Sequence, residues 1–203
     1  IDVADLTLDE YLHFILTYTF LEPILFYYCG DFRRNNIFCI PYKQADDYIK
    51  QINTLFFEYR NTNSKDALNS ILRMTEKYGA LNILPTNTFG SLEFRLHPGT
   101  LEKAKIIEWI NILLSIKKYS YKKTPEGFPE FISGVGIKEE IYTIFGKSLA
   151  DLLYHPMLSL ELLDSLRVVQ DMISLHTYNN NETEVKRTII KKAQLEFKKT
   201  STF

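Results

Sequence analysis

The feature that most constrains this chain is an alternation of apolar and polar side chains over residues 91–97. Successive side chains of a β-strand point to opposite faces, so the alternation predicts a strand with one buried face and one polar face. The apolar face carries Leu92, Phe94 and Leu96. The polar face carries Ser91, Glu93, Arg95 and His97. A carboxylate, a guanidinium and an imidazole are therefore expected in one row.

This predicted strand leads through Pro98 and Gly99 to Thr100, after which apolar residues recur at helical spacing. Thr100 is a suitable N-cap, because its hydroxyl can accept a hydrogen bond from a free amide in the first turn. The N-terminus of a helix carries partial positive charge. The polar row is therefore expected to end at a place that favours an anionic ligand.

A second strand is predicted at 80–84, and the connection between the two contains Pro85, Asn87 and Gly90. Turn-forming residues between two strand-like segments favour a β-hairpin. Asn82 in the first strand is expected on the same face as Glu93. With the helices described next, this hairpin predicts an α+β fold that is mainly helical with a small antiparallel sheet.

Helical periodicity dominates the rest of the chain. A capping box formed by Thr7 and Glu10 begins a predicted helix over 7–22, and Pro23 is expected to bend or restart the chain after it. The apolar run 24–28 fits either a helix or a buried strand, and 30–44 has the composition of a loop. Further helices are predicted at 45–59, 64–76, 101–119, 138–145, 148–153, 156–176 and 182–199. The core stripe expected in the helix 101–119 is Ile106, Ile107, Ile110, Leu113 and Leu114.

Composition limits the classes of partner. The 24 basic and 25 acidic residues nearly cancel, so the surface offers no field that would gather nucleic acid or an anionic membrane. A membrane-spanning helix needs about 20 apolar residues, and the most apolar window is interrupted by Glu22 and Pro23. We therefore expect neither nucleic acid nor membrane as a partner.

Cys29 and Cys39 are too few for a disulfide framework and do not form a Cys-x-x-Cys pair. Reduced thiols and the lack of a signal peptide predict a cytoplasmic location. Because the chain begins at Ile1 rather than Met, we expect that an upstream segment was removed, cleaved or left out of the numbering. The phosphate-loop, dinucleotide-binding, nucleophile-elbow and His-Glu-x-x-His motifs are absent from the sequence.

Three blocks resemble, in order, the signature of the amidoligases, ATP-dependent carboxylate–amine ligases related to glutamine synthetase and glutamate–cysteine ligase. The first block is RRNNIFCIP at 33–41. The central block is YGALNI at 78–83 followed by GSLEFRLHPGTL at 90–101. The third block is IEWI at 107–110, and the resemblance extends over residues 8–120.

The resemblance implies that ATP activates a carboxylate as an acyl phosphate, which an amine then attacks. It gives Mg²⁺ binding to Glu93 and stabilisation of the γ-phosphate to Arg95, with His97 as a second catalytic residue. These residue types suit the roles, because Mg²⁺ takes oxygen ligands and a guanidinium neutralises a transferring phosphoryl group. The residues it implies for binding of substrate or nucleotide are Arg33, Arg34, Asn82 and Thr100.

Structural explanations stay open beside these roles. On a solvated sheet face, Glu93 and Arg95 could form an ion pair worth about 0.2–1 kcal/mol. His97 and Asn82 could form structural hydrogen bonds, and Thr100 could serve as a helix cap alone. Arg33 and Arg34 could be solvated charges in a loop.

The resemblance also implies that the small sheet is half of a curved, glutamine-synthetase-like sheet. No Glu-x-Glu strand precedes residue 93, so the other metal-binding carboxylates are expected upstream of this chain or elsewhere. We divide the chain at the turn-rich stretch 122–127. Residues 1–121 are then the C-terminal part of an amidoligase-like catalytic domain, 122–178 a helical appendage, and 179–203 a charged C-terminal helix.

Two hypotheses for function follow. The first is an ATP-dependent ligase that joins a small-molecule or peptide carboxylate to an amine. The alternative is a non-catalytic binding or assembly module that keeps the ligase-like fold without the metal-binding half. In that case the C-terminal helices are expected to contact a partner subunit.

Overall fold

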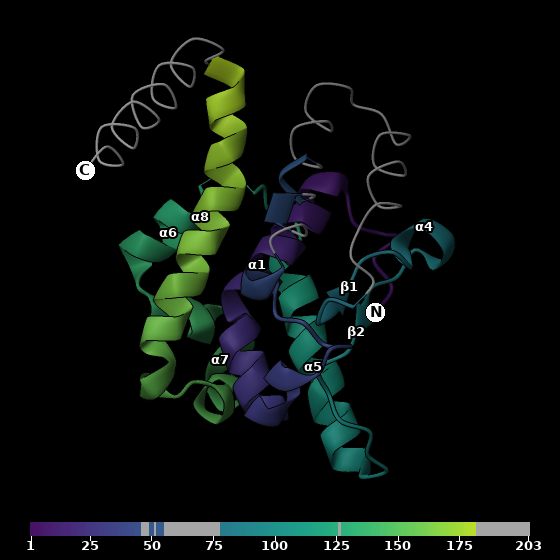
Figure 1. Cartoon of the computed structure of the whole chain (residues 1–203). Helices are drawn as coiled ribbons and strands as arrows, with labels where there is room; N and C mark the ends of the chain where they lie inside the picture. The colour runs from purple at the N-terminus through teal and green to yellow at the C-terminus, as the bar shows by residue number, and fades with distance from the viewer. Residues whose placement is uncertain (46–48, 51, 55–77, 126, 182–203) are drawn as a thin grey trace, which may run out of the picture.

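Helix α1, Leu8–Cys29, runs through the centre of the molecule (Figure 1). The computed structural model describes residues 1–45, 49–50, 52–54, 78–125 and 127–181. The predicted capping box is confirmed, because the Thr7 hydroxyl accepts the Glu10 amide and the Glu10 carboxylate accepts the Thr7 amide. Every residue from Tyr11 to Phe26 is buried. A helix buried all round needs other elements on every side.

The helix extends beyond the predicted range 7–22, because α1 continues through Pro23 to Cys29. A proline inside a helix costs about 3 kcal/mol. Ile24, Leu25 and Phe26 are almost completely buried, and each such side chain contributes about 1.5–3 kcal/mol by leaving water. Burial after Pro23 therefore offsets the proline, and it makes the ambiguous run 24–28 a helix.

Four helices surround α1. α5, Lys103–Ser120, and α8, Ser159–Asn181, pack along it, and α7, Ile137–Leu153, contacts both α1 and α5. α6, Phe128–Val135, packs against α7 and α8. α7 bends at Gly146, whose φ of 70° suits glycine, and the bend separates the two helices predicted at 138–145 and 148–153. The 3-10 helices are η1, Asp31–Asn35, η2, Tyr42–Gln44, and η3, Pro156–Leu158.

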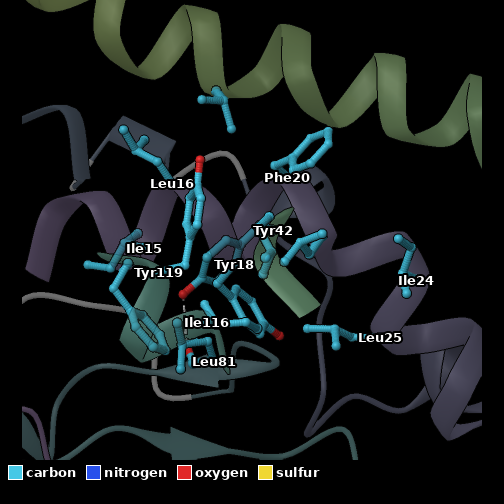
Figure 2. Close-up of a cluster of buried hydrophobic side chains, with 14 of the residues drawn as sticks. Ile15, Leu16, Tyr18, Phe20, Ile24, Leu25, Tyr42, Leu81, Ile116 and Tyr119 are labelled. Atoms are coloured by element: carbon cyan, nitrogen blue, oxygen red, sulfur yellow. Dashed lines mark hydrogen bonds between the residues drawn. The ribbon is translucent and has the colours of Figure 1, made fainter. Parts of the chain in front are cut away.

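One hydrophobic core joins these elements. Figure 2 shows Phe20 of α1 directed toward α8, while Leu81 lies on the opposite side of α1. The same buried cluster includes Ile141 of α7 and Leu162 and Val169 of α8. Residues 122–178, predicted as a helical appendage, therefore share their core with residues 1–121.

The predicted hairpin is present. β1, Leu81–Asn82, pairs antiparallel with β2, Glu93–Phe94, with Leu81 opposite Phe94 and Asn82 opposite Glu93. Isolated bridges join Ile40 to Gly79 and Asp2 to Ser91. The prediction of a mainly helical α+β fold with a small antiparallel sheet is confirmed.

The connection between the strands contains a short helix, α4, Thr86–Phe89, where the sequence suggested a loop. Gly90 ends α4 with a left-handed φ of 62°. Glycine is favoured there because a side chain would crowd this conformation.

Helix α5 differs from its prediction at its start and in its orientation. It begins at Lys103 with Glu102 as the N-cap residue, so Thr100 is not the cap. Its buried residues are Ile112, Leu113, Ile116, Tyr119 and Ser120. The other four residues of the predicted core stripe are exposed, namely Ile106, Ile107, Ile110 and Leu114. Periodicity identified an apolar face, but packing on α1 and α7 selected a different one.

Three other predictions fall on residues that the structure leaves undescribed. The predicted helices 64–76 and 182–199 lie outside the described residues. Of the predicted helix 45–59, residues 45, 49–50 and 52–54 are described; Ala45 lies outside any helix, and the other five residues are helical.

His13 and Glu22, which are charged or titrate near neutral pH in water, are both buried in α1. Burial lowers the pKa of His13 to about 3, with a further contribution from the positive charge of Lys123. Burial raises the pKa of Glu22 to about 8, although its Oε2 accepts the Tyr42 amide at 2.9 Å. Both side chains are therefore neutral at neutral pH.

Replacing Glu22 by Gln is expected to give a stability advantage over the wild type that grows as pH rises, because the wild type loses stability. The native carboxyl stays protonated to about pH 8, while the unfolded carboxyl ionises near 4.5. Between these values, rising pH favours unfolding of the wild type by about 1.4 kcal/mol per pH unit. Gln stays neutral in both states and keeps an acceptor for the Tyr42 amide.

The measurement is urea denaturation of wild type and Glu22→Gln across this pH range. The stability advantage of Glu22→Gln should grow with pH, whereas Glu139→Gln, at an exposed position of α7, should show little change. A difference that stays constant with pH would contradict a buried protonated Glu22.

Candidate functional site

The polar face of the hairpin brings together Asn82, Glu93 and Arg95. Glu93 Oε2 accepts hydrogen bonds from Asn82 Nδ2 at 2.6 Å and from Arg95 Nη2 at 3.0 Å. Asn82 reaches Glu93 because the two residues are directly opposite in the register. The expectation that Glu93 and Arg95 share one face is confirmed, and Asn82 joins them.

Arg95 is held more deeply than the carboxylate that it contacts. Its side chain is 17% exposed, against 48% for Glu93. In the part of the chain that the structure describes, Nε of Arg95 is buried without a hydrogen-bond partner. Leaving a buried donor unpaired costs about 1–3 kcal/mol, so Arg95 retains a capacity for binding that this hairpin does not use.

Arg33 reaches, from η1, the segment that directly follows β2. Its Nε donates to the Leu96 carbonyl at 3.0 Å and its Nη2 to the Arg95 carbonyl at 2.6 Å. A planar guanidinium can make two such bonds from one fork. Arg33 therefore positions the backbone that carries Arg95, and its role at the site is structural before any ligand is considered.

Arg34 points elsewhere. Its Nε donates a hydrogen bond to Asp31 at 3.0 Å, and its Nη1 forms an ion pair with Glu161 of α8 at 2.8 Å. Its guanidinium also lies 5.3 Å from the centre of the Phe26 ring. The two neighbouring arginines are thus separated in function: Arg33 supports the hairpin, and Arg34 links η1 to α8.

The side chain of His97 does not lie on the polar face with Glu93 and Arg95, where it was predicted. Its ring lies 5.3 Å from the Trp109 ring and 6.5 Å from the Tyr28 ring, measured between centroids. Trp109 also contacts Phe94, which belongs to the apolar face of β2. The prediction that His97 shares a face with Glu93 and Arg95 is therefore wrong. The regular strand ends at Phe94, and strict alternation ends with it.

The proton of neutral His97 can be assigned from its contact with the backbone. Nδ1 lies 2.6 Å from the Pro98 carbonyl oxygen, which can only accept a hydrogen bond. Nδ1 therefore carries the proton, and Nε2 is the acceptor of the neutral ring.

A pocket of about 430 Å³ opens beside His97 at the start of α5. Its lining residues are Tyr28, Cys29, His97, Pro98, Gly99, Thr100, Glu102 and Lys105. The Thr100 hydroxyl accepts the Glu102 amide, and Lys105 forms an ion pair with Glu102 at 2.9 Å. The structure thus brings His97 and Thr100 together, while Glu93 and Arg95 are not among the residues that line this pocket.

Three residues of this region were not predicted from the sequence as site residues. Tyr28 lies in the last turn of α1, and Trp109 and Lys105 lie in the first half of α5. The Tyr28 and Trp109 rings stack with their centroids 6.2 Å apart. Burial, together with the hydrogen bond from its hydroxyl to Glu108 at 2.5 Å, raises the pKa of Tyr28. Tyr28, Lys105 and Trp109 come together only because α1 packs against α5. The sequence signal was the IEWI block, which contains Trp109.

Both cysteines are buried free thiols. Burial raises the pKa of Cys29 to about 12 and also raises the pKa of Cys39. Because the thiolate is the reactive form, neither is a candidate nucleophile, although Cys29 lines the pocket.

Glu93 is the predicted Mg²⁺ ligand, and its environment limits how it could act. Protein-bound Mg²⁺ commonly uses one or two carboxylates together with phosphate oxygens and water. The exposed carboxylate of Glu93 fits one such ligand of an ion that arrives with a nucleotide. Among the described residues, no three His, Cys, Asp or Glu side chains gather as a metal site. These residues therefore do not form a complete cage by themselves.

Comparison with known proteins gives no match to a family model, to a curated protein or to a solved structure. Among the described helices, none has the length and apolar character needed to cross a membrane.

Replacing Arg33 by Ala is expected to lower the free energy of unfolding by about 1–3 kcal/mol, because two carbonyl acceptors lose a charged donor. Thermal or urea denaturation measures the change. Arg167→Ala is the matched control, since Arg167 is 75% exposed and pairs with Asp164 on the same helix. That control should stay within about 0.5 kcal/mol of wild type. Equal effects of both substitutions would contradict the supporting role of Arg33.

Proposed function

We propose that this chain belongs to an ATP-dependent carboxylate–amine ligase of the amidoligase type. One observation carries the proposal: two of the sequence blocks that resemble amidoligases meet at a single hairpin. Arg33, from the first block, bonds the carbonyls of Arg95 and Leu96 in the second, and Ile40 bridges to Gly79. The third block adds Trp109 against Phe94 and His97.

In this proposal Arg95 binds the anionic part of the nucleotide. Arg33 and Glu93 hold its backbone and guanidinium in place, so little conformational freedom would be lost on binding. A positioned cation stabilises negative charge that develops in a transition state, and this effect is often the largest single contribution to catalysis. The unpaired Nε and the low exposure of Arg95 support a role beyond that of a surface charge.

Glu93 would bind Mg²⁺ through its exposed carboxylate, with Asn82 orienting that carboxylate from the neighbouring strand. ATP and Mg²⁺ together would supply the phosphoryl group that activates the substrate carboxylate. The remaining oxygen ligands would come from phosphates and from carboxylates outside the described residues.

The pocket at the start of α5 is proposed to receive the substrate. With the Nδ1 proton held by the Pro98 carbonyl, Nε2 of His97 can take a proton from the ammonium group of the substrate, which leaves the neutral amine free to attack. The Thr100 hydroxyl and Lys105 offer hydrogen bonds to a carboxylate or phosphate. A cytoplasmic location is part of the proposal, because free thiols such as Cys29 and Cys39 persist in a reducing compartment.

The non-catalytic module stays as a second candidate because of the closed network around Glu93. One carboxylate oxygen already accepts bonds from both Asn82 and Arg95, as a purely structural ion pair would. In that case the hairpin keeps the ligase-like arrangement for stability, and the helices of 122–178 contact a partner subunit.

The test uses the protein at its full natural length with ATP, Mg²⁺ and a panel of amino-acid and peptide carboxylates and amines. We expect phosphate release that depends on both substrates. Glu93→Gln and Arg95→Lys should each lower the rate by roughly 100-fold or more, because each removes charge or geometry needed in the transition state. Arg167→Ala, on the exposed face of α8, should leave the rate unchanged.

Unfolding measured on the same samples separates loss of catalysis from loss of fold. If both variants keep the wild-type rate, the mechanism proposed for Glu93 and Arg95 is refuted. A folded wild type that releases no phosphate with any substrate pair would favour the binding module.

A further inference from the structure

Helix α5 is apolar on two faces, and only one of them is buried. The inner face packs through Ile112, Ile116 and Tyr119. On the outer face Ile107 and Ile110 are each 45% exposed and Leu114 is 47% exposed. These three residues follow a spacing of three and four, so they form one continuous stripe along the helix. The start of α5 projects from the rest of the molecule in Figure 1.

A groove of about 640 Å³ continues this stripe toward α7. It opens where Gly146 bends α7 and separates the two halves of that helix. The apolar residues that line it are Ala104, Ile107, Phe145, Leu149 and Leu152. Leu152 is itself 52% exposed, so the apolar surface extends from one helix to the other.

Three lysines lie at the rim of this surface, and Glu108 also lines the groove. Lys103 and Lys118 lie at the two ends of the stripe, and Lys147 lines the groove; all three are exposed. Within the described residues none of these lysines forms an ion pair. The neighbouring acids are engaged, because Glu108 accepts the Tyr28 hydroxyl and Asp151 accepts the Tyr142 hydroxyl.

This charge pattern argues against a second copy of the chain as the occupant. Two α5 stripes paired antiparallel about Ile110 would place Lys103 of each copy near Lys118 of the other. Paired in parallel, they would place each lysine near its own equivalent. Both symmetric arrangements juxtapose like charges at each end of the contact, which is unfavourable.

We propose that the outer face of α5 and the adjoining groove bind an amphipathic helix with acidic residues at its edges. Apolar side chains of such a helix at spacings of three, four and seven would fill the groove. Its carboxylates would pair with Lys103, Lys118 and Lys147. The stripe from Lys103 to Lys118 is about 22 Å long, which corresponds to a helix of about four turns. This surface does not include Glu93, Arg95 or His97, so the inference is independent of the ligase proposal.

The experiment uses two synthetic peptides of about 16 residues that share a leucine stripe. One carries Glu at both ends and the other carries Lys at the same positions. Fluorescence polarisation with the full chain measures binding. We expect the Glu peptide to bind at least about tenfold more tightly than the Lys peptide, with an affinity that falls as salt rises.

Two variants make the test specific. Ile110→Glu should abolish binding of the Glu peptide while circular dichroism shows an unchanged fold, since this side chain is exposed. The double variant Lys103→Glu, Lys118→Glu should reverse the preference and bind the Lys peptide more tightly.

Three outcomes would overturn the proposal. The first is equal binding of the two peptides, which would indicate non-specific apolar contact. The second is absence of binding by the Glu peptide. The third is a dimer in analytical ultracentrifugation that Ile110→Glu dissociates, which would make a second copy the occupant.

Discussion

The burial of helix α1 on every side is the constraint on which the rest of the structure depends. Every residue from Tyr11 to Phe26 is buried, so α5, α7, α8 and the hairpin must all pack against α1. This burial also accounts for two local exceptions. Pro23 is accepted inside the helix, and Glu22 and His13 are held neutral, because the surrounding apolar contacts outweigh each of these costs.

The candidate site depends on that core through Arg33 and Phe94. Phe94 packs against Phe14 and Tyr18 of α1, which fixes the apolar face of β2 and leaves Glu93 and Arg95 on the other face. Arg33 then ties the segment that directly follows β2 to η1, directly after α1. A strand this short would be weak alone, and its position comes from these contacts rather than from sheet hydrogen bonds. Any role of Glu93 and Arg95 in catalysis rests on this support.

Local patterns predicted most of the elements and part of the site. The Thr7 capping box, the hairpin with Glu93 and Arg95 on one face, and the helix pair around Gly146 follow from interactions between residues close in sequence. Predictions failed where a distant contact decided the outcome. His97 turned toward Trp109 once the strand ended, and Thr100 lost its role as a cap because α5 begins at Lys103. Tyr28 lines the pocket because α1 packs against α5, and a contact between two helices that are distant in sequence cannot be predicted from a local pattern.

By itself, the sequence determined most of the long helical segments and that Glu93 and Arg95 point the same way, because these properties depend on near neighbours along the backbone. It did not determine α4, α6 or the helical course of residues 24–28. The tertiary structure alone decided which face of each helix is buried. In α5, two apolar faces competed for the core, and the one carrying Ile112 and Ile116 packed on α1 and α7, leaving Ile107, Ile110 and Leu114 exposed. Hydrophobic burial has no direction of its own, so the choice between two apolar faces falls to the shape of the neighbouring elements.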